Sequence, residues 1–289
     1  MPESVDEFIK SINSPIKKIM CGDLLLLGSQ ILQHIVGNDP AAATAPALKV
    51  IQDDTINAEG IDGLIIVTSG LIDYCLALAI PRLDDFNEIY IQFNSSPPLS
   101  ICHSSFLWVL MHEYTHARRR HNFILENVTN NTLTRQTLEY DADLSATANI
   151  FRWSQYHLHD HISTQKIKRL VYYNIFWAIR NLAPPPKHSD HLPSATRLFH
   201  INAKLSSLRE DPFASPDPSM ISSECRESAD DLSKLATELE ISYAKREGFD
   251  VKQHLFEQLS IIESGEWSSV VRRWDDIRTT VSILSGTQT

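Results

Sequence analysis

The pattern of apolar and polar positions predicts a helical N-terminal layer followed by a small sheet. Residues 5–37 carry apolar side chains at helical spacing, and Gly37-Asn-Asp-Pro40 provides the residues that end a helix. The chain then changes to short apolar segments typical of strands, at 47–52, 63–68 and 88–93. We therefore expect a helical layer over residues 1–40 and a small sheet over 47–93.

The second half of the chain is predicted to be almost entirely helical. Helical patterns cover 134–151, 163–182 and 194–208, and another begins at Ser104-Ser105. Residues 210–224 hold three Pro and four Ser, which favours a mobile loop, and the helices after it should break at Gly248 and Gly265. The pattern predicts a mostly helical α+β fold, with one domain over 1–208 and a helical C-terminal layer over 209–289.

A pair of histidines four residues apart follows an apolar helical run. His112-Glu113-Tyr114-Thr115-His116 comes directly after Phe106 to Met111. On a helix, His112 and His116 share a face and can bind one metal ion, while Glu113 overhangs the open side of that ion. A zinc ion with three protein ligands keeps a position for water and needs a neighbouring carboxylate to take the proton of that water. Glu113 is therefore the expected general base.

A second helical motif supplies two carboxylates. Glu139 and Asp143 are also four apart, so both face the same way. Glu139 would complete a site of two histidines and a glutamate, and Asp143 would accept the distal ring N–H of a ligand, with His112 the expected donor. The alternative is a solvated acidic helix face. A polar loop is expected from His121 to Thr134, with His121 a helix-end residue rather than a ligand.

These motifs resemble the gluzincin metallopeptidases. His112-Glu113-x-x-His116 followed by Glu139-x-x-x-Asp143 is most similar to soluble relatives of the prenyl-protein and heat-shock membrane zinc proteases, and to the bacterial Lit phage-exclusion peptidases. The segment from Asn57-Ala58 to Leu71 and the segment from His191 to Arg197 also resemble stretches of those membrane proteases. The likeness covers roughly residues 48 to 205 and implies a zincin-like metallopeptidase domain.

The resemblance also implies roles for residues outside the two motifs. His191 would act in catalysis by stabilising the oxyanion of the tetrahedral intermediate or by binding the substrate carbonyl, with a nearby Tyr as the alternative for the oxyanion. Arg197 would lie behind His191 or contact the substrate directly. In zinc peptidases of this type the substrate adds as a strand to the edge of the sheet. Asn57, Ala58 and the 63–68 strand are the candidates for that edge, and the alternative is that they are ordinary sheet residues.

Composition and charge narrow the range of partners. The net charge of −10 and the lack of a basic stripe argue against nucleic acid or an anionic membrane as the main partner. No signal peptide and no membrane-spanning run of apolar residues is visible, so no membrane insertion is expected. The four cysteines, Cys21, Cys75, Cys102 and Cys225, are widely spaced, which is typical of reduced thiols in a cytoplasmic protein.

The expected function is a zinc-dependent endopeptidase that acts on a cytosolic protein or peptide. Zn²⁺ is the expected cofactor, held by His112, His116 and Glu139. One alternative is a triggered or regulatory zincin-fold protein, a phage-defence or stress sensor that binds a protein partner and cleaves only when activated. A purely structural zinc site is disfavoured, because such a site is normally closed by a fourth protein ligand and gains nothing from Glu113.

Overall fold

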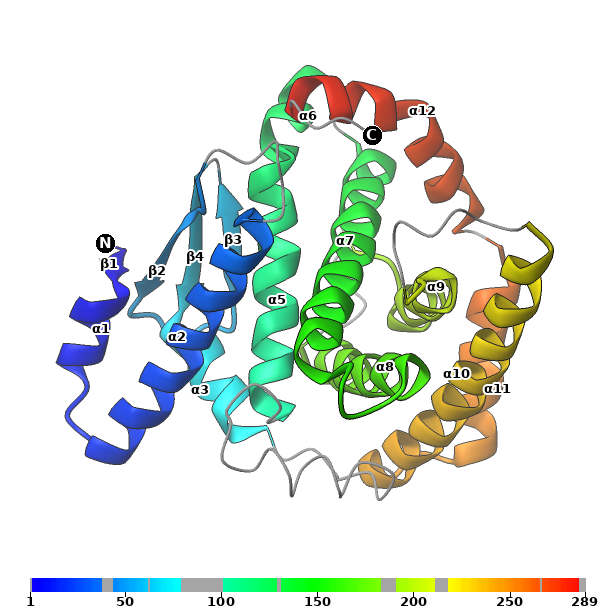
Figure 1. Ribbon diagram of the computed structural model, residues 1–289, viewed down its shortest axis with the longest axis horizontal. Coiled ribbons are helices and arrows are strands. Elements are labelled where there is room, and N and C mark those ends of the chain that lie inside the picture. The colour runs from blue at the N-terminus through cyan, green and yellow to red at the C-terminus, as the bar shows by residue number, and fades with distance from the viewer. Residues whose placement is uncertain are drawn as a thin grey trace. The chain divides into compact units, whose positions relative to one another are not determined.

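The computed structural model has a mostly helical α+β fold with a small mixed sheet (Figure 1), as the sequence predicts. It describes residues 2–37, 44–61, 63–78, 101–128, 131–182, 191–210, 218–265 and 267–285. The chain forms two compact units, one of residues 1–130 with 276–289 and the other of residues 131–275. The boundary expected at residue 208 therefore falls inside the second unit.

The first unit contains all the described strands. They are β1 (Glu3–Ser4), β2 (Ala47–Ile51), β3 (Ala58–Ile61) and β4 (Leu64–Thr68). Its helices are α1 (Val5–Ser11), α2 (Pro15–Gly37), α3 (Ser69–Ala77), α5 (Ile101–Arg118) and α6 (His121–Asn127), together with the last part of α12 (Ser268–Ser285). The expected N-terminal helical layer is thus two helices, and the second ends at Gly37 as predicted.

The sheet has the strand order β1-β2-β4-β3. The adjacent strands β2 and β4 are parallel, and β3 runs antiparallel to β4. Two strands expected from the sequence are confirmed as β2 and β4, whereas the expected strand at 88–93 lies outside the described residues. Because β4 lies between β2 and β3, the prediction that the 63–68 strand forms the sheet edge is wrong. Among the described strands, β3 forms the edge on that side.

The core of the first unit forms where α2 and α5 meet the sheet. A Cβ on Gly28 of α2 would lie 2.9 Å from Leu110 and 3.6 Å from Leu48, so this glycine lets the helices and β2 approach closely. The helix α2 is also long and apolar enough to cross a membrane by length and composition, which the sequence pattern did not predict. Core helices of soluble proteins and signal sequences near an N-terminus pass the same test. Leu24, Leu25 and Ile31 of α2 are fully buried, whereas Ile16, Ile19 and Leu26 are exposed.

The second unit consists of helices. They are α7 (Thr132–Leu158), α8 (Thr164–Leu182), α9 (Ser194–Ser207), α10 (Pro218–Glu247), α11 (Val251–Glu263) and the beginning of α12. The helices predicted at 163–182 and 194–208 are confirmed, as are the breaks at Gly248 and Gly265, which have φ values of 75° and 69°. The predicted loop at 210–224 is wrong from Pro218 onwards, because α10 begins there.

A buried histidine in α9 lies among aromatic rings of the second unit. His200 is 7% exposed, and its ring centroid lies 4.9 Å from that of Tyr140 and 5.0 Å from that of Trp267. Its Nε2 atom is buried and has no hydrogen-bond partner among the described residues. Burial lowers the pKa of His200 from 6.5 to about 4, although the nearby charge of Asp143 opposes the shift. His200 is therefore neutral in the folded protein at neutral pH.

Acidification should destabilise the protein through His200. The unfolded chain takes up the proton near pH 6.5, whereas the folded protein resists it down to about pH 4. Stability is therefore constant above that window and falls within it, by about 2 kcal/mol between about pH 7 and about pH 5. Urea unfolding at both pH values, with His200→Phe as the comparison, measures this. The variant should lose less stability than the wild type, and equal losses would contradict the assignment.

Candidate metal centre

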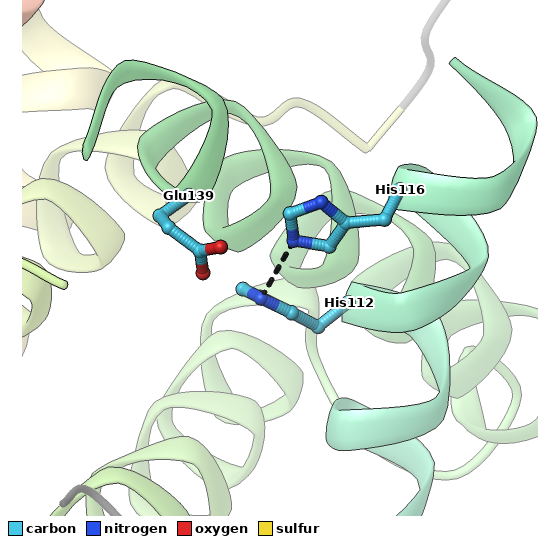
Figure 2. A group of neighbouring side chains, drawn as sticks. All are labelled: His112, His116 and Glu139. Carbon is cyan, nitrogen blue, oxygen red and sulfur yellow. Dashed lines mark hydrogen bonds between the residues drawn. The ribbon is translucent and has the colours of Figure 1, made fainter. Parts of the chain in front are cut away.

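The α5 helix places two imidazoles on one face. Its apolar run is buried, with Phe106, Leu110 and Met111 fully inaccessible, which fixes the rotation of the helix in the first unit. His112 and His116 then have ring centroids 4.8 Å apart, and their Nε2 atoms lie 3.1 Å apart (Figure 2). Two nitrogens bound to one tetrahedral zinc ion would lie about 3.3 Å apart. The pair therefore has the spacing that a shared metal ion requires.

Glu113 is held by the edge strand. The backbone N–H of Gly60 in β3 donates a hydrogen bond of 2.8 Å to Glu113 Oε2. The two elements are in such close contact that a Cβ on Gly60 would lie 2.0 Å from the carbonyl oxygen of Glu113. Only glycine allows this approach without a shift of the backbone. The Glu113 carboxylate is therefore positioned by both α5 and β3. The hydrogen bond from Gly60 involves Oε2 and not Oε1.

The direction of the Gly60 N–H shows which backbone groups face the sheet edge. Thr68 N donates to Asn57 O at 3.0 Å, so Asn57 is paired with the end of β4. Because neighbouring residues of a strand point their backbone groups to opposite sides, Ala58 and Gly60 face away from β4. The backbone groups of Ala58 thus face the edge, and its contact with a substrate stays a prediction. The backbone carbonyl of Asn57 does not face the edge, because it accepts the hydrogen bond from Thr68 N.

Glu139 lies on α7 in the second unit. This helix begins after Asn131, whose side chain accepts a hydrogen bond from Thr134 N, so the motif lies well inside a capped helix. The carboxylate of Glu139 is mostly buried, and its Oε2 lies 3.0 Å from His191 Nδ1. His191, which lies just before the start of α9, is therefore close to the candidate ligand Glu139. Its proposed role on the oxyanion stays a prediction.

Asp143 and Arg197 form a buried ion pair. The Nε and Nη2 atoms of Arg197 each donate to one oxygen of Asp143, both at 2.7 Å. The two side chains are 5% and 7% exposed, and the Asp143 charge raises the pKa of Arg197 against the effect of burial. This contradicts direct contact of Arg197 with a substrate, because its guanidinium is buried against Asp143. The hydrogen bond expected from His112 to Asp143 stays a prediction.

His112, His116 and Glu139 form a group that could hold a metal ion. Each offers one ligand atom, and these atoms lie within 4.8 Å of one another. Figure 2 shows both imidazoles, which come from α5, together with the Glu139 carboxylate from α7. Two imidazole nitrogens and one carboxylate oxygen are a donor set of catalytic zinc sites with three protein ligands. The residues present therefore fit a divalent metal of this kind.

The sequence pattern did not predict the contact between His121 and His116. The stretch from His121 to Thr134 was expected to be a polar loop, but its first half is α6. His121 is 1% exposed, and its Nδ1 lies 3.0 Å from Nδ1 of His116. The only signal for this contact is the spacing of five residues, which does not place two side chains on one face of a helix.

No protein-family model, curated protein or solved structure matches the chain.

Proposed function

We propose that the protein is a zinc-dependent endopeptidase. The observation that carries the proposal is the grouping of His112, His116 and Glu139, with ligand atoms within 4.8 Å of one another. Glu113 adds a carboxylate that is not among these ligands and is held in place by Gly60. A structural zinc site is normally closed by four protein ligands, so three ligands and a neighbouring carboxylate favour catalysis.

Each residue has a task in the hydrolysis of a peptide bond. A zinc ion at this site would polarise the scissile carbonyl and lower the pKa of its water to about 7. Glu113 takes the proton of the attacking water and delivers it to the leaving amine. His191 stabilises the oxyanion of the tetrahedral intermediate. The Asp143–Arg197 pair keeps α7 and α9 in a fixed relation, because both ends of this buried contact are hydrogen-bonded.

The sheet edge supplies a site for an extended substrate. The backbone groups of Ala58 and Gly60 face away from β4, so a peptide added beside β3 would meet the outward-facing backbone groups of Ala58. A pocket of about 180 Å³ beside His116 would receive one side chain of the peptide. The pocket is lined by Gly60, Ile61, His116, Arg120, Asn122, Phe123 and Glu126. The proposed substrate is therefore a protein segment in extended conformation.

Removing a ligand should remove the metal. His116→Ala and Glu139→Ala should each bind zinc at least about 100-fold more weakly than the wild type, since each loses a direct donor. Mass spectrometry of the metal in purified protein measures the stoichiometry, and circular dichroism checks the fold. His159→Ala is the control, because His159 is exposed at the end of α7. Full zinc stoichiometry in both ligand variants would overturn the ligand assignment.

A further inference from the structure

The contact between His116 and His121 has the geometry of a hydrogen bond between two imidazoles. The Nδ1 atoms lie 3.0 Å apart, and the ring planes are perpendicular with centroids 4.7 Å apart. Both residues belong to the first unit, and His121 is buried. The Nε2 atom of His116 faces His112 on the other side of the ring. Each ring nitrogen of His116 thus faces a nitrogen of another histidine.

This geometry is possible only because the helix is interrupted. On a continuous helix, residues five apart lie about 140° apart around the axis, so His121 would point away from His116. Here α5 ends at Arg118, and Arg120 adopts the left-handed conformation with φ 54° and ψ 45°. A left-handed residue other than glycine is uncommon and costs conformational energy. The turn it makes starts α6 at His121 and directs that imidazole back to His116.

The direction of the hydrogen bond follows from the chemistry of metal ligation. His116 can bind a metal through Nε2 only if Nε2 carries a lone pair, so its proton must be on Nδ1. Nδ1 of His116 is then the donor, and Nδ1 of His121 is the acceptor. The reverse direction would put the proton of His116 on Nε2, in the position that a metal ion needs. His121 therefore selects the tautomer of His116, provided that its own proton is on Nε2.

We propose that His121 is a positioning residue for the metal ligand His116. By accepting from Nδ1–H, it fixes the tautomer and the ring orientation in which Nε2 points at the metal position. Ligating histidines usually find this partner in a carboxylate, a backbone carbonyl or water. In this chain a third histidine takes that place. The inference deepens the proposed function and rests on it, because it assumes that His116 is a ligand.

Two variants of equal shape separate positioning from packing. Asn places its side-chain oxygen where His121 has Nδ1, so His121→Asn retains an acceptor. His121→Leu has the same shape as Asn but cannot accept a hydrogen bond. Leu should weaken zinc binding about 10- to 100-fold, the usual effect of losing such a partner, while Asn should bind zinc nearly as well as the wild type. If His121 acted through packing alone, the Asn variant would not bind zinc more tightly than the Leu variant.

The zinc affinity is measured by competition with a chromophoric chelator, and the ligand field by the visible spectrum of the Co²⁺-substituted protein. Equal zinc affinity and an unchanged Co²⁺ spectrum in His121→Leu would overturn the positioning role while leaving the metal site intact. His116→Ala serves as the reference. If that variant keeps zinc at full stoichiometry, the proposed function itself fails, so the two failures are distinguishable.

A second measurement does not depend on a variant that folds. Nuclear magnetic resonance of the full chain with ¹⁵N-labelled histidine reports the protonated nitrogen of each ring. We expect His116 to carry its proton on Nδ1 and to show a coupling across the hydrogen bond to Nδ1 of His121, with or without zinc. A proton on Nε2 of His116 in the metal-free protein, or the absence of the coupling, would overturn the proposal.

Discussion

Replacing Glu113 with Gln should abolish peptide hydrolysis and leave the metal in place. Gln is neutral and cannot take a proton from water, and losing a general base typically lowers the rate about 10²- to 10⁴-fold. The measurement compares new protein N-termini in bacterial cytosol that expresses either the wild type or the variant. A small set of termini that depends on Glu113 would establish proteolysis and identify the substrate in the same experiment.

The Gln variant is well matched to the wild type in structure. Its side-chain oxygen can still accept the hydrogen bond from Gly60 N–H, which the wild-type carboxylate accepts at 2.8 Å. Zinc content should therefore be unchanged, and Glu238→Gln, a change at an exposed residue of α10, should affect neither property. Undiminished cleavage in the Glu113 variant would exclude its role as the base. A wild type that contains zinc but produces no new termini would instead favour the triggered sensor.

Breaking the Asp143–Arg197 pair should strongly destabilise the second unit. Arg197→Met leaves the Asp143 carboxylate buried without the two guanidinium donors that bind its oxygens at 2.7 Å. Removing one member of a buried ion pair typically costs about 3–5 kcal/mol. Urea unfolding followed by circular dichroism gives the change in the free energy of unfolding.

An exposed ion pair provides the contrast for this measurement. Lys17 and Asp73 lie 2.7 Å apart in the first unit, but their side chains are 43% and 48% exposed. Lys17→Met should therefore change the free energy of unfolding by less than about 1 kcal/mol. The double variant Arg197→Met with Asp143→Leu should recover much of the loss, because no buried charge then remains. A small effect of Arg197→Met alone would mean that water reaches the pair.

The parts of the fold that the sequence predicts are those with strong local signals. The apolar helix α8 and the breaks at Gly248 and Gly265 follow from periodicity and from residues suited to positive φ. The edge strand β3 has no such signal, since Ala-Glu-Gly-Ile lacks a regular alternation of apolar residues. Its strand conformation comes from pairing with β4 and from contact with α5.

The candidate site likewise contains residues that local spacing predicts and residues whose positions only the fold determines. His112, Glu113 and His116 could be grouped because a spacing of four on a helix fixes their geometry. His121 could not, since its position depends on the left-handed backbone at Arg120. The resemblance predicts that Arg197 lies near the site, but only the fold shows that its guanidinium is hydrogen-bonded to Asp143.

The fit between β3 and α5 also limits how the length of this strand can vary. Inserting or deleting one residue before Gly60 would bring a neighbour with a side chain, Glu59 or Ile61, against the α5 backbone, where a Cβ on Gly60 would be 2.0 Å from an oxygen atom. Such a shift would also exchange the backbone groups that face the edge with those that pair with β4. For the proposed peptidase, changes of cleavage preference would therefore arise by substitution at Ala58 and Ile61, with the spacing of the strand preserved.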